Sequence, residues 1–520
     1  MRSSVGVLAV VTGLVLGLGP SAGARGPAIG ARGPAVRAHG VVALRPLVTI
    51  PELRVGGPQP TQAVAPGFIG LSIEFSALPA YAGSDPNAVD PVFEQLIRNL
   101  APGQRPVLRI GGDSTDRSWV AVPGMPRPPG IRYTVGTSWL QTAGALARAL
   151  DARMTVGINL EVDSPRIAGV EARAMLDAIG RPSLAALELG NEPELYGTFP
   201  WYRKDGHGVK GRPPGWDVAS YIGDFARIAR SLPASIPLAA PATGSPSWWD
   251  QLGRMAVDEP RIRVATVHRY PLDRCFTAPG SPQYPTIPNL LTNASSAGLA
   301  DSVAGVTRTA HAHGLSLRVD EFNSVSCSGK RGVSDTFASA LWALDAAFAM
   351  ARVGVDGVNV HTFPGGIYQP FRLRQVGGLW RAGVRPEYYG LMMFAQAAPA
   401  GARLLAVSGS AGAQVTPWAT RAPDGTIHVV LINDSLHRPQ TVAVRIPGPS
   451  SLAALERLRA PSVSSTDGVT LGGQSFGAQT STGRLTGRAG NGVVALSAGV
   501  YTVPVPAASA AMLTLARSGD

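Results

Sequence analysis

Residues 184–194 read Leu-Ala-Ala-Leu-Glu-Leu-Gly-Asn-Glu-Pro-Glu, a short apolar run that ends in an amide and two carboxylates. The run 184–189 has the length and composition of a buried strand, and Gly190 marks its end. Seven further runs of the same kind occur before and after it in the sequence, and each is followed by a turn and a helical pattern. The eight expected strands are 68–75, 106–111, 154–160, 184–189, 236–240, 263–267, 315–320 and 355–360.

Amphipathic segments separate these runs, and strands that alternate with helices indicate a parallel sheet. The segments are 137–152, 169–180, 217–231, 299–313 and 335–353. Eight such units over about 300 residues favour a closed (β/α)8 (TIM) barrel. A doubly wound open sheet is the structural alternative.

The pattern changes near residue 402, where helical periodicity stops and short β-type runs begin, separated by Gly, Pro, Ser and Asn. Seven such runs predict a C-terminal antiparallel β-sandwich domain. The boundaries we expect are a signal peptide at 1–24, a flexible linker at 25–41, N-terminal strands at 42–65 that join the sandwich, a catalytic barrel at 66–398 and the sandwich at 399–520.

The first residues indicate export. Arg2 precedes an uncharged apolar run from Val5 to Gly19, and Ala22-Gly23-Ala24 is a small-residue cleavage site. We therefore expect a secreted, extracellular or periplasm-like protein that is not integral to a membrane. The net charge of +12 does not indicate a nucleic-acid partner, because the basic residues are mostly Arg and are spread along the chain without a basic run.

Polar and ionisable residues follow six of the eight expected strands at their carboxyl ends, where barrel active sites form. The groups are Glu74, Gly111-Gly112-Asp113, Gly190-Asn191-Glu192-Pro193-Glu194, His268-Arg269-Tyr270-Pro271, Asp320-Glu321-Phe322-Asn323 and His361-Thr362. Two carboxylates at one mouth are what glycoside hydrolysis requires: one protonates the leaving oxygen and the other attacks the anomeric carbon. Glu192 and Glu321 lie on strands from opposite sides of the mouth and are the predicted catalytic pair.

Asp320 competes with Glu321 for the second position. Successive residues of a strand point to opposite faces, so we expect only one of them to face the mouth, and we favour Glu321.

The ordered set of motifs resembles glycoside hydrolase family 79, the β-glucuronidases and heparanases of the retaining (β/α)8 clan. The matching segments are Leu71–Phe75, Leu108–Ser114, Leu189–Glu194, His268–Pro271 and Glu321–Ser324. The resemblance implies that Glu192 is the acid/base, Glu321 the nucleophile and Asn191 the residue that holds the sugar 2-OH. It also implies that Tyr270, or His268, hydrogen-bonds the nucleophile.

The family's substrate is a β-linked glucuronic acid, whose carboxylate needs fixed donors such as backbone N–H groups and Tyr hydroxyls. The loops 326–330 and 364–368 qualify. The predicted sugar-binding residues are Glu74, Asp113, Asn191, His268, Tyr270, Asn323, Gly366 and Tyr368. Cys275 and Cys327 follow neighbouring strands, so a disulfide between them is geometrically plausible, as expected for two cysteines of an exported chain.

The resulting hypothesis is a retaining enzyme without cofactor or metal that removes terminal β-glucuronic acid, or its 4-O-methyl ether, from an oligosaccharide, polysaccharide or glycoconjugate. Three alternatives stay open. They are an endo-acting heparanase-like enzyme, another clan glycosidase of the xylosidase or arabinofuranosidase type, and a non-catalytic carbohydrate-binding protein. The sequence does not indicate an oligomeric state.

Overall fold

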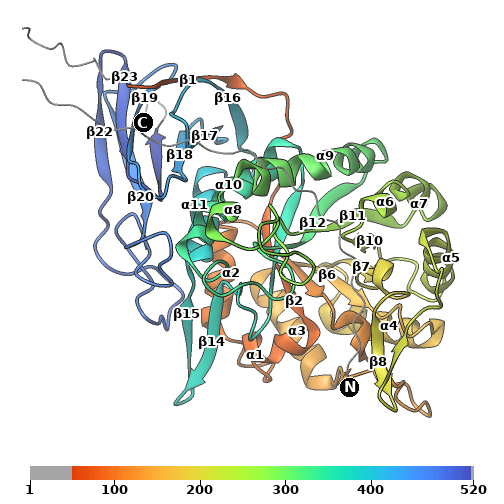
Figure 1. Cartoon of the computed structure of the whole chain (residues 1–520). Helices are drawn as coiled ribbons and strands as arrows, with labels where there is room; N and C mark the ends of the chain where they lie inside the picture. The colour runs from red at the N-terminus through yellow and green to blue at the C-terminus, as the bar shows by residue number, and fades with distance from the viewer. Residues whose placement is uncertain (1–49, 517–520) are drawn as a thin grey trace, which may run out of the picture. The chain divides into compact units, whose positions relative to one another are not determined.

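The computed structural model describes residues 50–516, shown in Figure 1. The expected signal peptide at 1–24, the linker at 25–41 and the first part of the expected N-terminal strands lie outside the described residues. Among the described residues, no helix has the length and hydropathy that a membrane span requires.

Eight parallel strands close into a barrel in the order β10-β11-β12-β13-β2-β3-β6-β7. The ring is complete because β13 pairs with β2, which rules out the open doubly wound sheet. All eight strands expected from the sequence are present. They are β2 (Ile69–Glu74), β3 (Val107–Gly111), β6 (Arg153–Ile158), β7 (Leu184–Leu189), β10 (Leu238–Thr243), β11 (Ile262–Arg269), β12 (Ser316–Phe322) and β13 (Gly357–Thr362).

Longer helices follow the strands and cover the barrel. Ser164 and Asp217 cap two of them by accepting hydrogen bonds from backbone N–H groups of the first turn. The longer helices are α2 (Pro91–Leu100), α3 (Thr137–Leu150), α4 (Pro165–Ile179), α5 (Val218–Ala229), α9 (Ala297–Ala312), α10 (Phe337–Arg352) and α11 (Pro386–Ala397). The shorter ones are η1 (Phe75–Ala77), α1 (Leu78–Ala82), η2 (Thr115–Arg117), η3 (Pro193–Leu195), α6 (Pro246–Trp249), α7 (Leu252–Asp258), α8 (Ile287–Leu290) and η4 (Asn293–Ser295).

Three small two-stranded sheets stand in the loops that follow β3, β7 and β13. They are β4 (Ser118–Trp119) with β5 (Tyr133–Thr134), β8 (Pro200–Lys204) with β9 (His207–Lys210), and β14 (Phe371–Val376) with β15 (Leu379–Val384). The hairpins β8–β9 and β14–β15 project from the same end of the barrel, the end at which the parallel strands finish (Figure 1).

The remaining strands form a β domain in the order β21-β20-β22-β23-β19-β1-β16-β17-β18-β24, and β20 also pairs with β24. Strand β1 lies between β16, to which it is antiparallel, and β19, to which it is parallel. The strands are β1 (Glu52–Pro58), β16 (Arg403–Gly409), β17 (Val415–Arg421), β18 (Ile427–Asn433), β19 (Gln440–Arg445), β20 (Leu452–Arg459), β21 (Thr470–Leu471), β22 (Gly492–Ser497), β23 (Val500–Val505) and β24 (Ser509–Leu515). Strands β20 and β23 are absent from the sequence-based expectation.

Helix α10 packs between the barrel and the β domain, which explains why it has no polar face: every residue from Phe337 to Ala351 is buried. Trp418 of β17 stacks on Phe348 and donates its indole N–H to the Asp345 carboxylate at 2.7 Å. The β domain is therefore fixed to the barrel by apolar packing and by a buried hydrogen bond.

Candidate active site

The predicted catalytic residue Glu192 lies in a tight turn directly after β7. Gly190 and Glu192 both have positive φ (79° and 46°), and the N–H of Glu192 donates to the carbonyl of Ala242 at 2.8 Å. A left-handed conformation is uncommon for a residue with a side chain and persists where its surroundings fix it. The turn directs the Glu192 carboxyl to a position where a quarter of the side chain is exposed.

Glu321, near the end of β12, faces Glu192 across the mouth of the barrel. One carboxylate oxygen of each residue and a ring nitrogen of His268 all lie within 4.8 Å of one another. Sequence reasoning predicted that the two carboxylates would meet, and the structure brings them together.

The Glu321 carboxylate is surrounded by donors and positive charge. Its Oε1 accepts from the guanidinium of Arg109 at 3.1 Å, and its Oε2 accepts from the hydroxyl of Tyr270 at 2.9 Å. His361 Nδ1 lies 3.6 Å from Oε1. Burial alone would raise the pKa of Glu321, but the charges of His361, His268 and Arg109 outweigh it and hold the pKa well below its usual value. Glu321 is therefore ionised at neutral pH.

His268 connects the two carboxylates. Its Nδ1 lies 3.0 Å from Oε1 of Glu192 and 3.8 Å from Oε2 of Glu321. Burial opposes a charge on the imidazole, but Glu321, Asp320 and the hydrogen bond to Glu192 raise the pKa of His268 to about 10. Glu192, His268 and Glu321 are the group of described residues whose spacing could hold a metal ion. In this structure the ring nitrogen of His268 is within hydrogen-bond distance of Glu192, so the set is arranged to share a proton.

Arg109, on β3, is the fully buried centre of the site, and it is not among the residues predicted from the sequence. Its guanidinium donates to Glu188 at 2.6 Å and to the Asn191 side-chain oxygen at 2.8 Å, besides Glu321. The sequence did contain one indication of this pair: Arg109 and Glu188 are each a charged residue inside an apolar run. A charge is buried in a core only when it is paired, so the two residues could have been expected to contact each other.

Asp320 also reaches this centre, which corrects the expectation that only one of two successive residues faces the mouth. Its Oδ2 lies 3.2 Å from Arg109 Nε, and the pairing of β12 with β13 shifts register between Val319 and Phe322. A register shift interrupts the alternation of side chains along a strand. Burial and the neighbouring Glu188 raise the pKa of Asp320 well above its usual value, despite the opposing charge of Arg109.

Glu74 and Asp113 lie together at the ends of β2 and β3, but in different environments. Glu74 is buried and accepts from the backbone N–H groups of Asp113 and Ser114, at 3.1 and 2.8 Å, and from the Ser114 hydroxyl. His361 Nε2 lies 3.5 Å from it. The Asp113 side chain is 68% exposed, and its nearest cation is Arg117 at 3.8 Å. Asp113 is therefore free to bind a ligand, whereas Glu74 is partly engaged in holding the loop.

Two predicted sugar-binding residues have their donors occupied within the protein. Asn323 is fully buried, and its amide donates to the backbone carbonyls of His361 and Tyr368 at 3.0 and 3.4 Å. The N–H of Gly366 closes a turn by donating to the carbonyl of Phe363. Both residues therefore shape the wall of the site. Tyr368 lies in that wall, stacked against Tyr270 with ring centroids 6.3 Å apart.

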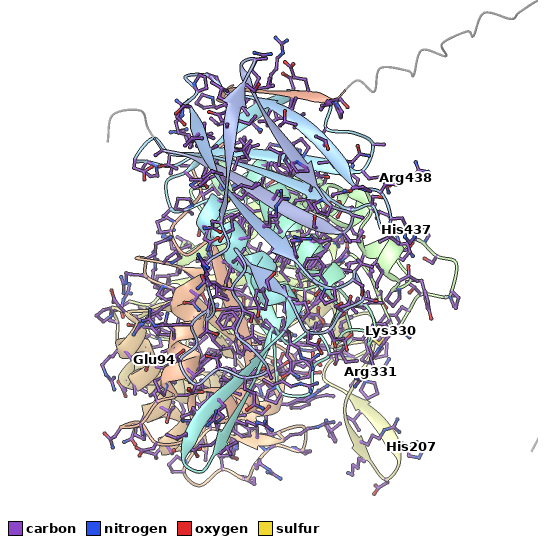
Figure 2. All side chains as sticks on the ribbon, turned by 90° about the vertical axis from the view of Figure 1, so that its left-hand side faces the viewer. Glu94, His207, Lys330, Arg331, His437 and Arg438 are labelled. Atoms are coloured by element: carbon purple, nitrogen blue, oxygen red, sulfur yellow. A yellow bond between two sulfur atoms is a disulfide. The ribbon has the colours of Figure 1, made fainter. Side chains whose placement is uncertain are left out.

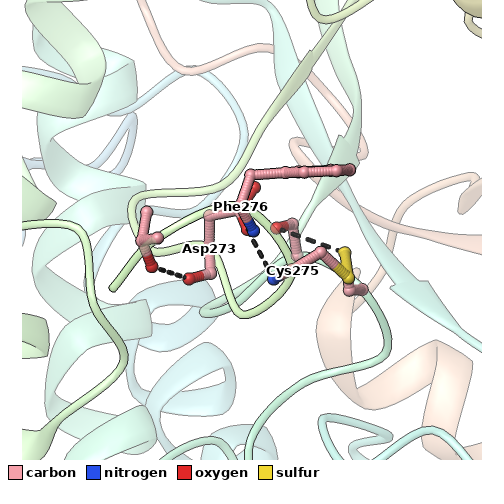
Figure 3. The surroundings of a disulfide bond; sticks show 6 residues. Asp273, Cys275 and Phe276 are labelled. Atoms are coloured by element: carbon pink, nitrogen blue, oxygen red, sulfur yellow. Dashed lines mark hydrogen bonds between the residues drawn. A yellow bond between two sulfur atoms is a disulfide. The ribbon is translucent and has the colours of Figure 1, made fainter. Parts of the chain in front are cut away.

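Cys275 and Cys327 form a disulfide, as the sequence suggested, and it joins the loops that follow β11 and β12 (Figure 3). The Asp273 carboxylate accepts from the N–H groups of Cys275 and Phe276 at 2.7 and 2.8 Å, which orders the first loop. Cys327 and Ser328 have positive φ, and the Ser328 carbonyl accepts from the N–H of Ile367. The bridge therefore stiffens a wall that includes the loop before Tyr368.

Three basic residues lie on loops that follow strands of the barrel. His207 lies at the projecting tip of the β8–β9 hairpin, and Lys330 and Arg331 lie on the loop that follows Cys327 (Figure 2). The base of the hairpin is anchored by Trp201, which is buried in a small cluster with Trp119 and Ile131. The insertion 198–216 therefore forms a fixed rim on one side of the site.

Comparison with protein families supports the assignment suggested by the motifs. Residues 418–512 match the family model described as the glycosyl hydrolase family 79 C-terminal beta domain. A β-glucuronidase from Aspergillus niger is 25% identical over 515 residues, covering 86% of this chain and 90% of that protein. A β-glucuronidase from Neurospora crassa is 24% identical over 389 residues, covering 65% of this chain and 64% of that protein. The chain thus spans just under two thirds of the Neurospora protein.

Solved structures share the whole fold. A 4-O-α-L-rhamnosyl-β-D-glucuronidase from Fusarium oxysporum superposes with a TM-score of 0.72 at 22% identity, covering 89% of this chain and all of that one. An arabinofuranosidase of family 51 from Xanthomonas axonopodis pv. citri gives a TM-score of 0.63 at 16% identity, with 89% of this chain covered and 100% of that one. At these identities the superpositions show the fold alone. The chain is therefore similar to β-glucuronidases over most of its length, and its residues 418–512 are similar to the C-terminal β domain of glycosyl hydrolase family 79.

Proposed function

We propose that this protein is a retaining glycosidase that removes terminal β-linked glucuronic acid by double displacement. The observation that carries the proposal is the approach of a Glu192 oxygen and a Glu321 oxygen to within 4.8 Å. Retaining enzymes hold their two carboxyl groups ~5–5.5 Å apart, whereas inverting enzymes need ~6.5–9.5 Å to admit a water. The approach of the two oxygens is closer to the retaining arrangement than to the inverting one, which supports direct attack of Glu321 on the sugar.

The environments of the two carboxyls support their roles. Glu321 is buried, and the charges around it keep it ionised, as a nucleophile must be. Glu192 is the more exposed of the two, so a leaving group and later a water can reach it. His268 also supports Glu192, because an imidazolium beside its Oε1 stabilises the carboxylate that remains once the proton has been given away.

The reaction then proceeds in two steps. Glu321 attacks the anomeric carbon while Glu192 transfers its proton to the departing glycosidic oxygen, which gives a glycosyl ester on Glu321 and a free alcohol. Glu192, now a carboxylate, next takes a proton from water, and the resulting hydroxide displaces Glu321 from the anomeric carbon. The released sugar has the β configuration of the substrate.

Asn191 and Asp113 supply the contacts for the sugar hydroxyls in this proposal. The side-chain oxygen of Asn191 is held by Arg109, so its amide N–H groups face outward to the 2-OH. Asp113, with its exposed carboxylate, suits the 3-OH or 4-OH, and Glu74 supports it from below. Tyr270 orients the nucleophile by donating to it.

We also propose that the enzyme prefers a uronic acid to a neutral sugar. Two relatives are named β-glucuronidases, and the wall beside Glu321 offers the Tyr368 hydroxyl together with the loop at Cys327–Gly329. Three successive residues of this loop have positive φ, a backbone path that turns N–H groups outward toward an anion. We infer that the substrate carries a terminal glucuronic acid, or its 4-O-methyl ether, on a carbohydrate that is accessible to a secreted enzyme.

The experiment is hydrolysis of p-nitrophenyl β-D-glucuronide by the purified protein, with Glu321→Ala as the control. We expect release of nitrophenol by the wild type and loss of essentially all turnover in the variant, because the variant lacks the carboxylate that attacks the anomeric carbon. Proton NMR at early time should show the β-anomer of free glucuronic acid first. Early α-anomer would refute the retaining assignment, and near-normal turnover of Glu321→Ala would refute the nucleophile.

The same assay separates the rival substrates. Release from aryl xylosides or arabinofuranosides, but not from the glucuronide, would overturn the uronic acid preference and leave the catalytic pair intact. Oligosaccharides as the first products of a polymer digest would show endo action, whereas release of single glucuronic acid residues supports the terminal action proposed here.

A further inference from the structure

Asp116 is a buried carboxylate, 3% exposed, that lies in η2 after β3 and accepts four hydrogen bonds. Its Oδ1 accepts from the N–H groups of Leu160 and Glu161 at 2.9 and 3.1 Å. Its Oδ2 accepts from the N–H of Asn191 at 2.9 Å and from the hydroxyl of Tyr196 at 2.6 Å. One side chain thus joins the carboxyl ends of three neighbouring barrel strands, β3, β6 and β7.

The segment that Asp116 holds on β7 is the turn that carries the acid/base residue. The N–H of Asn191 is shared between Asp116 and the Tyr196 hydroxyl, the latter at 3.2 Å. On the other side, the N–H of Glu192 donates to Ala242. The turn has positive φ at Gly190 and Glu192, a conformation that needs support from both sides to persist. Asp116 and Tyr196 supply the support on the β6 side.

The ionisation state agrees with this geometry. Burial raises the pKa of Asp116 above its usual value, although the hydrogen bonds from Tyr196 and from backbone N–H groups oppose this shift. The neighbouring Glu161 is buried beside the Asp116 charge, and its pKa is raised to about 9, so Glu161 is neutral at neutral pH. Four donors converge on Asp116, and an acceptor with four donors is satisfied only as the carboxylate.

We propose that Asp116, together with Tyr196, is a positioning residue for the glycosidase reaction: it fixes the backbone of Asn191 and thereby places the Asn191 amide and the Glu192 carboxyl against the sugar. Arg109 fixes the other end of Asn191 through its side-chain oxygen, so backbone and side chain are each held by one charged group. The inference rests on the proposed function, because it takes Asn191 to bind the 2-OH and Glu192 to move the proton.

Asp116→Asn is the direct test, since it keeps the shape but replaces one acceptor oxygen by an NH2 group that cannot accept from Asn191. The full-length protein is assayed on the best aryl glycoside of the panel. A hydrogen bond to a charged group corresponds to ~10–150-fold in rate, so we expect kcat to fall by that factor while KM changes by less than ~3-fold. Tyr196→Phe should lower kcat less, and the double variant should be no worse than Asp116→Asn.

Glu171→Gln is the matched control. Glu171 is another buried carboxyl group, and burial raises its pKa well above the usual value. It accepts from the N–H of Asn159 at 3.0 Å at the end of β6 and has no hydrogen bond to the turn at 190–192. We expect Glu171→Gln to leave kcat near the wild-type value, whatever its effect on the melting temperature. A general loss of packing would instead affect the two variants alike.

A substrate that lacks the 2-OH gives a second test. If Asp116 only stabilised the fold, its substitution would not change the ratio of the rates on the substrates with and without the 2-OH. The 2-deoxy aryl glycoside should be a poor substrate for the wild type, and the ratio of the two rates should approach one in Asp116→Asn. Equal kcat losses in Asp116→Asn and Glu171→Gln, or an unchanged 2-OH ratio, would overturn the inference. If Asp116→Asn does not fold, Tyr196→Phe carries the same test. An error in the proposed function would be detected by a different result, because the Glu321→Ala variant would then remain active.

Discussion

Arg109→Gln should both destabilise the protein and abolish activity, because Arg109 is the cation at the centre of the buried site. The exposed fractions of the side chains are 1% for Arg109, 0% for Glu188 and 9% for Glu321. Removing one partner of a buried ion pair costs ~3–5 kcal/mol, since the other charge stays buried without compensation. Domains are stable by only ~5–15 kcal/mol, so the loss is a large part of the total.

The double variant Arg109→Gln/Glu188→Gln distinguishes this explanation from a simple loss of packing. Removing the Glu188 charge as well should restore part of the stability, with a coupling of ~0.5–3 kcal/mol expected for residues in direct contact. Activity should stay lost, because Glu321 still lacks its guanidinium donor. Urea unfolding followed by tryptophan fluorescence gives the stabilities, and nitrophenol release gives the activity. A single variant that loses less than ~1 kcal/mol, or a double variant less stable than the single one, would refute the reasoning.

Two further predictions concern His268 and the disulfide. The pKa of His268 is raised from 6.5 to about 10, so its protonation stabilises the fold fully below pH 6.5, and this contribution is lost as the pH rises toward 10. The melting temperature of the wild type should therefore fall more steeply between pH 7 and 10 than that of His268→Gln, and parallel curves would contradict the raised pKa. The Cys275–Cys327 bridge closes a loop with a sequence separation of 52 residues, for which chain entropy gives up to ~4 kcal/mol. Reductant should lower the melting temperature of the wild type but not that of a variant with serine at both positions, and an equal response would show that the bridge contributes no stability.

The sequence was sufficient to predict the strands of the barrel and the meeting of Glu192 with Glu321. Apolar runs followed by polar residues are a local signal, and barrel closure brings their ends together without further information. The eight strands therefore appeared as expected, whereas β20 and β23 were not predicted. Strand β20 reads Leu-Ala-Ala-Leu-Glu-Arg-Leu-Arg, which is rich in helix-forming residues, and β23 contains Pro504, which is unfavourable in a strand.

Other parts of the site depend on tertiary contacts that no local pattern shows. Arg109 and Asp116 act through partners 37 to 212 residues away, so their roles follow from packing. Asn323 and Gly366 have the right residue types for sugar binding, but their donors are already used by backbone carbonyls. The register shift in β12 placed Asp320 beside Arg109 against the rule of alternation.

Strand β1 gives the β domain an order of assembly. It comes from the beginning of the described chain, yet it fills the place between β16 and β19, more than 340 residues later. The barrel is synthesised before β16 and β19, the two neighbours of β1. The backbone groups of β1 therefore stay unpaired until these C-terminal strands have been synthesised. The matched family segment 418–512, produced alone, would lack both β1 and β16 and would leave β19 with an open edge. The β domain is therefore the last part to close, and joining the two ends of the chain completes the fold.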